Sequence, residues 1–305
     1  MSNYKLVTYE SAAGPRAGLV IGEQVFDAAE RSGEPAYATV LGILNDWPKA
    51  QGKLRDAAAK GGGKAVPLAQ AKLRAPILWP GTIYCAGANY SDHMLEMARA
   101  HNTEPEAEPH SVGLKPWHFI KAARTLADPG ATVTLPKASK EIDWEAELAA
   151  VIGLPAKDVP IDKALDYVAG YTAGNDLSAR DLMRRPPVRP TSPFFSDWVG
   201  QKCFDGACPL GPWIVPASDI ADPHNLGIKL WVNDVIKQDS NTGKMIFNIA
   251  EQISHLSTGI TLHPGDMIMT GTPAGVGAGR NEFLKAGDVV RTEIAEIGSI
   301  SNTMA

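Results

Sequence analysis

Residues 141–153 read Glu141-Ile142-Asp143-Trp144-Glu145-Ala146-Glu147-Leu148-Ala149-Ala150-Val151-Ile152-Gly153. Acidic and other residues alternate in the first half, and the second half is a continuous apolar run. Side chains two apart on a strand face the same side, so the pattern predicts one strand with four carboxylates on one face that then enters the core. Like charges on one face repel, so this face must meet water, accept protons or hold a cation. Glu-x-Glu alone leaves a solvated edge strand and a metal site equally open.

A further carboxylate follows at Asp176, where an apolar stretch ends in Gly174-Asn175-Asp176. Three carboxylates suit hard cations such as Mg2+, Mn2+ or Ca2+, whereas zinc usually brings His or Cys. The alternative is that Asp176 caps a helix beginning at Leu177. The segment by itself favours neither.

A possible acid/base pair stands in the segment 85–97, where Gly87 predicts a turn and Asn89 a helix N-cap. His93 and Glu96 then share one helix face, so the carboxylate could orient the imidazole of a water-activating general base. The alternative is a surface His with a helical ion-pair partner. Residues 99–112 hold Pro and Asn breakers without apolar periodicity, which predicts a mobile loop and fits a lid over a substrate.

The rest of the chain predicts an α+β fold that is mainly β. Strands at 4–9 and 18–26 around a Gly-Pro turn, with helices near 39–44 and 49–60, indicate a small N-terminal domain over residues 1–74. Gly61-Gly62-Gly63-Lys64 lacks the P-loop spacing and predicts a turn. Residues 75–305 form the larger predicted domain, whose Val- and Ile-rich runs include 131–135, 148–153, 213–216, 228–232 and 289–294.

Composition excludes several classes of protein. The formal charge of -5 over 305 residues gives no basic field for nucleic acid. The longest apolar run, residues 148–154, is far short of the roughly 20 residues that cross a bilayer, so we expect no membrane partner. The first residues lack a secretory signal pattern, and Cys85, Cys203 and Cys208 form no CxxC pair, which favours a reducing, cytoplasmic location and structural cysteines.

Six motifs then occur in a fixed order. They are Gly87-Ala88-Asn89-Tyr90-Ser91-Asp92-His93, Phe119-Ile120-Lys121, residues 143–153 as quoted above, Gly170-Tyr171 through Asn175-Asp176-Leu177-Ser178-Ala179-Arg180-Asp181, Lys202-Cys203-Phe204-Asp205-Gly206-Ala207-Cys208-Pro209-Leu210-Gly211-Pro212, and Thr270-Gly271-Thr272-Pro273-Ala274-Gly275-Val276-Gly277. Because it carries these six motifs in this order, the chain resembles the fumarylacetoacetate hydrolase family. The N-terminal strand pair also looks like the small leading domain of that family.

The resemblance implies a mixed β-sandwich roll core with a small N-terminal α/β domain, a homodimer, and one Mg2+ or Mn2+ per subunit. Glu145, Glu147 and Asp176 match the metal ligands of the family. His93 and Glu96 match a water-activating pair on a lid helix that orders when substrate binds.

Four further positions match residues near the family's site. Lys202 matches a lysine suited to stabilising an oxyanion, and Lys121 matches another that is equally open to a structural role. Arg180 and Thr272 match substrate-contacting positions, Thr272 in a Gly-rich loop whose backbone N–H groups could hold a carboxylate.

These parts predict a hydrolase that cleaves a carbon–carbon bond in an acylpyruvate- or fumarylpyruvate-type 2-oxo acid through a metal-stabilised enolate. Two alternatives stay open. One is an isomerase or decarboxylase of a 2-hydroxymuconate-like or 2-hydroxyhepta-2,4-diene-1,7-dioate-like dicarboxylate from aromatic-ring breakdown, and the other is a non-catalytic cation-binding protein.

Met183 bears on this choice because many family members carry a Gln there that positions substrate or water. Its presence favours the isomerase or decarboxylase alternative. Arg184, Arg185 and Arg189 lie in the segment 184–196, which also contains four prolines. They suit either a substrate with a second carboxylate or a solvated loop at a dimer interface.

Overall fold

The apolar run after Glu145 forms β11 (Ala146–Ile152), which is buried along its whole length inside the largest sheet. The computed structural model describes residues 3–186 and 188–305. In that part of the chain a twelve-stranded sheet has the order β4-β3-β2-β1-β14-β12-β11-β17-β6-β7, with β5 beside β1 and β8 beside β14. Its other strands are β1 (Lys5–Ser11), β2 (Gly14–Ile21), β3 (Gln24–Asp27), β4 (Val66–Pro67), β5 (Leu73–Arg74), β6 (Ile83–Ala86), β7 (His118–Lys121), β8 (Leu126–Ala127), β12 (Val168–Asn175), β14 (Cys208–Pro216) and β17 (Met267–Met269).

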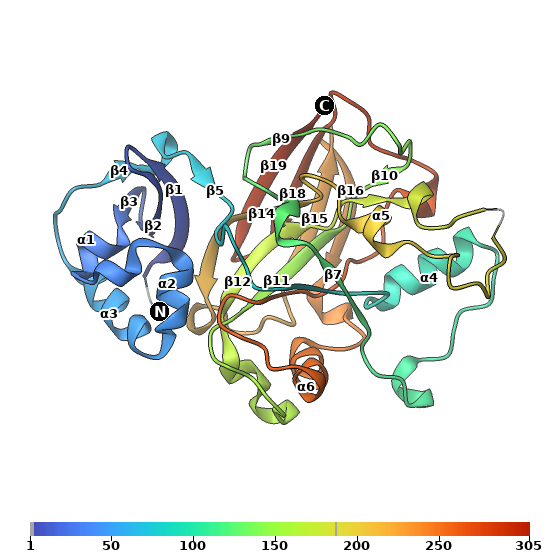
Figure 1. The fold of residues 1–305 in the computed structure, drawn as a ribbon, viewed down its shortest axis with the longest axis horizontal. Coiled ribbons are helices and arrows are strands. Elements are labelled where there is room, and N and C mark those ends of the chain that lie inside the picture. Colours follow the sequence, from blue (N-terminus) through green and yellow to red (C-terminus); the bar gives the residue numbers. More distant parts are fainter. Residues whose placement is uncertain (1–2, 187) are drawn as a thin grey trace.

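A second sheet of five strands packs against the first, so the core is a sandwich (Figure 1). Its order is β16-β15-β18-β19-β9, with β9 (Thr132–Val133), β15 (Gly227–Val232), β16 (Val235–Asn241), β18 (Val289–Ile294) and β19 (Gly298–Met304). A two-stranded pair, β10 (Ile142–Asp143) with β13 (Ser178–Ala179), lies at one end of β11. The predicted fold class, α+β and mainly β, is confirmed.

The alternation of side chains along β11 explains why both of its faces are apolar. Leu148 and Ala150 belong to the core cluster that includes Leu230 of the second sheet. Ala149 belongs to the opposite cluster, with Trp47 from the N-terminal helices. A strand covered on both faces needs a continuous apolar run, and this is the pattern that the sequence carries.

The N-terminal part follows the prediction with two differences. The predicted strand 18–26 is two strands, β2 and β3, joined at Gly22, whose φ of +55° permits the tight turn. Gly14 and Pro15 begin β2 and do not form the turn. Because Leu6 of β1 pairs with Ile214 of β14, the sheet runs without a break from the N-terminal part into the rest of the fold. A domain boundary near Arg74 therefore stays a prediction.

Helices are few and short in the described residues. They are α1 (Ala28–Ser32), α2 (Val40–Asn45), α3 (Trp47–Ala59), α4 (Ser91–Ala100), α5 (Trp198–Lys202) and α6 (Ile249–Gly259), with 3-10 turns at Pro35–Ala38, Leu68–Gln70, Pro109–Val112, Ala123–Thr125, Ile161–Tyr167, Arg180–Leu182, Ala217–Asp219, Thr242–Lys244 and Ala278–Arg280. None of these helices has the length and apolar character that a membrane span requires.

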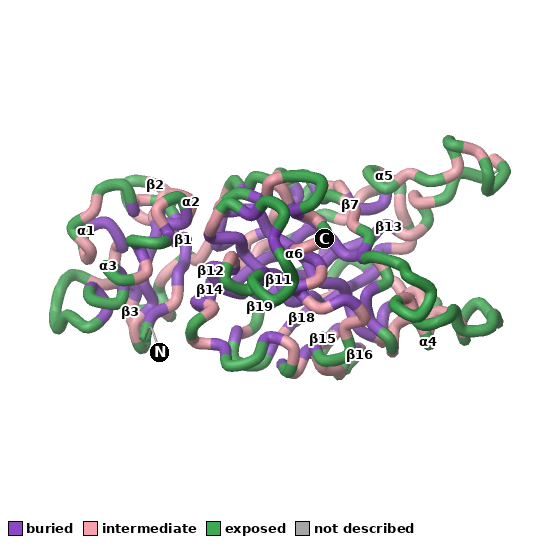
Figure 2. The backbone as a smooth tube through the Cα atoms, turned by 90° about the horizontal axis from the view of Figure 1, so that it is seen from below, coloured by how far each residue is buried: buried purple, intermediate pink, exposed green. Residues whose placement is uncertain are grey.

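Exposed loops gather beside α4 and α5, at the end of the molecule away from the N-terminal helices (Figure 2). Residues 101–117 have one 3-10 turn and are exposed along most of their length, whereas the first two residues of the predicted loop 99–112 belong to α4. The loop residues 184–186 and 188–196 lie at the same end. The predicted site residues are found between these two loops and the end of β11.

Candidate active site

The acidic segment is not one strand, which corrects the predicted row of four carboxylates. β10 ends at Asp143 and β11 begins at Ala146. In the gap, side chains from distant parts of the chain take over the backbone N–H groups: Asn175 Oδ1 accepts from Glu145 at 2.9 Å, and Gln238 Oε1 accepts from Ala146 at 2.9 Å. The break separates Asp143 from Glu145 and Glu147, so only the latter two reach Asp176.

Glu145, Glu147 and Asp176 form a buried triad whose ligand oxygens all lie within 4.8 Å of one another. The Asp176 N–H donates to the Glu145 carbonyl oxygen at 2.8 Å, which fixes the two residues relative to each other. Asp176 is followed by β13 and caps no helix, so that alternative is wrong. The arrangement instead supports the metal-site alternative.

The charges around the triad show which carboxylate lacks a counter-ion. Lys202 Nζ lies 2.8 Å from Glu145 Oε2 and 2.7 Å from Asp176 Oδ2. Lys121 Nζ lies 2.5 Å from Asp176 Oδ1. In residues 3–186 and 188–305, no lysine or arginine forms an ion pair with Glu147. Burial together with the negative charges of Asp176 and Glu145 raises its pKa well above the ordinary value. A hard divalent cation bound by carboxylate oxygens fits this site, because it would balance the negative charge of the triad that the two lysines do not neutralise.

The two lysines differ in their position. Lys202 lines the cavity described below, and although burial lowers its pKa, Asp176 and Glu145 raise it by more, so the group is a cation. Lys121 is 1% exposed, does not line the cavity, and also donates to the Leu177 carbonyl oxygen at 3.1 Å. This position favours the structural alternative for Lys121.

His93 and Glu96 lie on α4 with Nδ1 and Oε2 3.7 Å apart, too far for a hydrogen bond in this state. Their side chains are only 13% and 19% exposed, which argues against the alternative of an ion pair on the surface. The Gly275 N–H donates to Oε1 and Oε2 of Glu96 at 3.0 and 2.8 Å. Burial raises the pKa of Glu96, but His93 and this N–H lower it to below the ordinary value. His93 Nδ1 is buried without a hydrogen-bond partner among the described residues.

Asn89 does not cap α4, which begins after Tyr90 without a side-chain cap. Its amide nitrogen donates to the Phe247 and Thr270 carbonyl oxygens at 2.9 and 2.8 Å, and its oxygen accepts from the Phe247 N–H at 2.9 Å. Asn89 therefore joins the start of α4 to the Gly-rich loop 270–277.

Four backbone N–H groups of that loop donate to the protein's own acids, which leaves fewer of them for a substrate carboxylate. The Gly271 N–H donates to Glu147 Oε2 at 2.8 Å, the Gly275 N–H to Glu96, and the Gly277 N–H to Asp143 Oδ1 at 2.5 Å. Gly271 is required there, since it has φ +98° and an added Cβ would lie 2.8 Å from Asn89 Cβ. The loop thus holds a metal-site acid, an acid of the dyad and Asp143 together.

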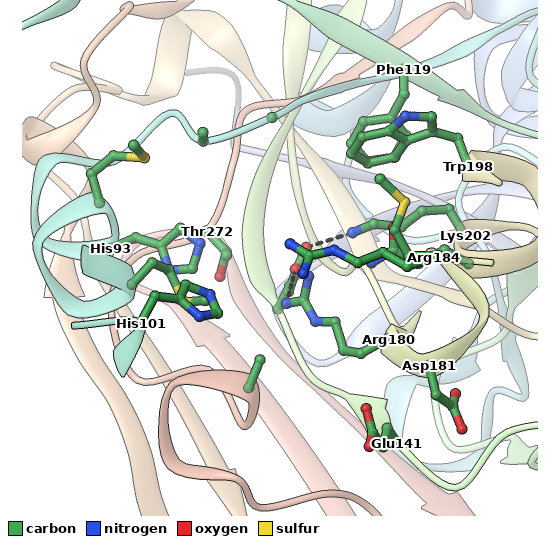
Figure 3. Close-up of a pocket in the computed structure, with 18 of the residues that line it drawn as sticks. His93, His101, Phe119, Glu141, Arg180, Asp181, Arg184, Trp198, Lys202 and Thr272 are labelled. Atoms are coloured by element: carbon green, nitrogen blue, oxygen red, sulfur yellow. Dashed lines mark hydrogen bonds and ion pairs between the residues drawn. The ribbon is translucent and has the colours of Figure 1, made fainter. Parts of the chain in front are cut away.

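A cavity of about 790 Å3 lies between α4 and the carboxylate triad. Figure 3 shows His93 and Thr272 on one side, and Arg180, Arg184 and Lys202 on the other, with Phe119 and Trp198 above them. The site residues that line it are His93, Glu145, Glu147, Arg180, Lys202 and Thr272. Thr272 Oγ1 accepts from Gln238 Nε2 at 2.8 Å, which holds the hydroxyl at the wall.

Asp143 is a site residue whose role the sequence did not indicate. It is fully buried, and its carboxylate accepts from Arg180 Nε at 2.8 Å and from the N–H groups of Gly277 and Ala278 at 2.5 and 3.1 Å. Arg180 also pairs with Glu145. Asp143 therefore positions Arg180 against the Gly-rich loop, and its place in the acidic segment was the only available signal.

Two other parts of the wall were also missed. Trp117, Phe119 and Trp198 form an aromatic group, with ring centroids 5.2 Å apart in the pairs that Trp198 makes. Gly87 permits it, because an added Cβ would lie 2.0 Å from the Trp117 ring. Gln201 lines the cavity, is 4% exposed, and its Oε1 has no partner among the described residues. Its place beside Lys202 is the signal that could have identified it.

Comparisons with known proteins agree with this geometry. The family model described as fumarylacetoacetate (FAA) hydrolase C-terminal matches residues 82–305. Oxaloacetate tautomerase fahd2, mitochondrial, of Xenopus laevis is 44% identical over 232 residues, which cover 75% of this chain and 67% of that protein.

Solved structures are similar over nearly the full length. Maleylpyruvate hydrolase from Sphingobium sp. SYK-6, in complex with manganese (II) ion and pyruvate, has a TM-score of 0.75 and 28% identity, covering 99% of this chain and 98% of that one. 2-Hydroxyhepta-2,4-diene-1,7-dioate isomerase from Mycobacterium marinum has a TM-score of 0.73 and 30% identity, with the same coverage.

These relatives are named as a tautomerase, a hydrolase and an isomerase, so the family alone does not choose among the reactions. The manganese-bound relative and the buried triad agree on a divalent metal. The family model matches residues 82–305. The chain is therefore an enzyme that belongs to the fumarylacetoacetate hydrolase family.

Proposed function

We propose that this enzyme catalyses the keto–enol tautomerisation of a small 2-oxo dicarboxylic acid, with oxaloacetate as the first candidate. The observation that carries the proposal is that His93, with Glu96 beside it, lines the same cavity as Glu145 and Glu147 of the carboxylate triad. The 44% identity with an oxaloacetate tautomerase supports this choice of reaction.

Glu145, Glu147 and Asp176 would hold the metal, for which we propose Mg2+ or Mn2+. When bound, such an ion supplies Lewis acidity that draws electron density from the keto and carboxylate oxygens of a 2-oxo acid and so acidifies the adjacent carbon. The remaining steps belong to side chains of this protein.

His93 is the proposed general base, because it lines the cavity and, unlike His101 in the same wall, has the Glu96 carboxylate beside it on α4. It would take the proton from C3 of the keto form as the C3–H bond breaks, the C2=C3 bond forms and the C2=O π electrons move to the oxygen. The protonated His93 would then return this proton to the oxygen to give the enol. Glu96, held by the Gly275 N–H, would stabilise the protonated imidazole.

Three groups would hold the substrate and the developing charge. Lys202 is a cation at the cavity wall and suits the developing enolate oxygen. Arg180 has 22% of its side chain exposed at the cavity and suits the carboxylate beside the keto group. The Thr272 hydroxyl is held in place by Gln238 and can hydrogen-bond to a substrate oxygen.

The test follows the absorbance of enol-oxaloacetate as it converts to the keto form, with Mg2+- or Mn2+-loaded protein and with EDTA. We expect catalysis with metal, its loss with EDTA, and a fall in kcat of at least about a hundredfold in His93→Ala. His263→Ala, which changes an exposed histidine outside the cavity, is the matched control and should leave kcat unchanged. A His93→Ala enzyme with full activity would exclude the proposed base.

Hydrolysis of an acylpyruvate is the second candidate, because the maleylpyruvate hydrolase relative shares the fold and its structure holds manganese and pyruvate. Met183 argues against it: the thioether lines the cavity and is only a weak hydrogen-bond acceptor for an attacking water. Metal-dependent formation of pyruvate and a free acid would favour hydrolysis over tautomerisation. Metal binding without any turnover would instead favour the non-catalytic alternative.

A further inference from the structure

We propose that Arg184 binds the distal carboxylate of the substrate and makes the enzyme selective for dicarboxylic over monocarboxylic 2-oxo acids. This inference rests on the proposed function for the identity of the substrate, and it adds the residue that recognises the far end of that substrate.

The cations of the cavity wall are matched by the protein's own acids, with the exception of Arg184. Arg180 pairs with Asp143 and Glu145, and Lys202 pairs with Glu145 and Asp176. Arg184 lines the same cavity, yet no carboxylate in the described part of the chain forms an ion pair with it. Its guanidinium is therefore available to a negatively charged ligand.

The backbone at Arg184 is held by a short antiparallel stem. Arg184 bridges Ser196, the Arg185 N–H donates to the Phe195 carbonyl oxygen at 2.9 Å, and the Asp197 N–H donates to the Met183 carbonyl oxygen at 2.7 Å. Asp197 also accepts from the Gly200 N–H at 2.8 Å as the N-cap of α5, the helix that carries Lys202. The stem thus fixes Arg184 relative to the proposed oxyanion group.

The direction of the side chain agrees with this role. Figure 3 shows Arg184 reaching into the cavity on the same side as Arg180 and Lys202, below the aromatic rings of Phe119 and Trp198. Arg184 is itself exposed, so it stands toward the mouth, whereas Glu145 and Glu147 are buried. A substrate whose 2-oxo acid end lies at the triad would place its far end toward Arg184.

The surroundings favour a planar carboxylate. A guanidinium binds a carboxylate through two parallel N–H···O bonds, which a lysine cannot reproduce. Phe119 and Trp198 line the same cavity and add apolar surface to its wall. A terminal methyl or ester group would leave the guanidinium without its partner.

The test compares two pairs of molecules that differ at the far end alone. Turnover is measured with oxaloacetate and its 4-methyl ester, and binding by calorimetry with malate and 2-hydroxybutyrate, which are stable analogues. The proteins are the metal-loaded wild type, Arg184→Gln, Arg184→Lys and the matched control Arg189→Gln. Arg189 is an exposed cation of the same loop that does not line the cavity.

We expect the wild type to prefer the diacid of each pair by about 10- to 100-fold, as for a charge-assisted hydrogen-bonded pair. Arg184→Gln should lose this preference through weaker binding of the diacid with unchanged binding of the monoacid, Arg184→Lys should keep part of it, and Arg189→Gln should keep all of it. Equal preference in the wild type and Arg184→Gln would overturn the inference, as would equal weakening of both ligands.

The binding measurement separates this inference from the proposed function. If oxaloacetate is not turned over but malate binds better than 2-hydroxybutyrate through Arg184, the proposed reaction fails and the carboxylate subsite stands. If oxaloacetate is turned over and Arg184→Gln shows the wild-type preference, the subsite fails and the reaction stands.

Discussion

Replacing Asp143 by Asn should destabilise the protein by about 3 kcal/mol. Asp143 is fully buried and accepts hydrogen bonds from Arg180 Nε at 2.8 Å and from the N–H groups of Gly277 and Ala278 at 2.5 and 3.1 Å. An Asn side chain has one acceptor oxygen in place of two, and its NH2 group must face one of these donors. Removing one partner of a buried ion pair costs about 3–5 kcal/mol, and the low end applies because Arg180 keeps its contact with Glu145.

Urea unfolding, followed by fluorescence, measures this cost in the metal-free protein. We expect the midpoint of Asp143→Asn to fall by about 1 M urea, because the m-value of a chain of this size is about 3 kcal/mol/M. Asp181→Asn is the matched control, because Asp181 is exposed and accepts from Ser139 Oγ and the Lys140 N–H. It should change the free energy of unfolding by less than about 1 kcal/mol.

The result that refutes this reasoning is an Asp143→Asn protein within about 0.5 kcal/mol of the wild type. Burial raises the pKa of Asp143, and such a result would mean that Asp143 is protonated in the native protein. Its pairing with Arg180 would then not be ionic, and Asp143 would not be the residue that orients Arg180 toward a substrate.

Three further predictions concern other groups. Burial lowers the pKa of His118 from 6.5 to about 4. The stability that neutral His118 contributes is therefore complete above about pH 6.5 and is lost as the pH falls toward 4. In urea titrations, the difference in free energy of unfolding between the wild type and His118→Gln should shrink over that pH range. Gln201→Leu should leave the free energy of unfolding unchanged or raise it by up to about 1 kcal/mol, because the buried Oε1 has no partner among the described residues. A clearly lower melting temperature would mean that Oε1 does have a hydrogen-bond partner in the native protein. Glu147→Gln should melt no lower than the wild type without metal, since it removes a buried carboxylate from beside Glu145 and Asp176. That variant should also lack the stabilisation of about 2.7 kcal/mol that Mn2+ at a hundred times its Kd gives the wild type, and equal stabilisation by Mn2+ would contradict the assignment of Glu147 as a ligand.

The features that could be predicted from the sequence depend on local patterns. The apolar run at 148–152 predicted a strand segment that enters the core, and β11 is buried along its whole length. The spacing of His93 and Glu96 predicted that they share a helix face, and α4 places both side chains together. In each case the neighbours along the chain determine the geometry.

The features that could not be predicted depend on contacts between distant residues. Asn175 and Gln238 take the N–H groups of Glu145 and Ala146, and this interrupts the acidic strand. Asn89 has the chemistry of a helix N-cap but binds the Thr270 and Phe247 backbone instead. A local pattern cannot report which of two possible partners a side chain will find once the chain has folded.

The most direct test of the proposed function follows products by NMR in D2O. Metal-loaded protein is incubated with oxaloacetate and, separately, with an acylpyruvate and fumarylpyruvate, with EDTA-treated protein and Glu147→Gln as controls. We predict metal-dependent exchange of the C3 protons of oxaloacetate for deuterium above the spontaneous rate, absent in both controls, with no release of pyruvate and a free acid from the acylpyruvates. Metal-dependent cleavage of an acylpyruvate, without accelerated exchange in oxaloacetate, would contradict the proposal and assign the His93–Glu96 pair to hydrolysis.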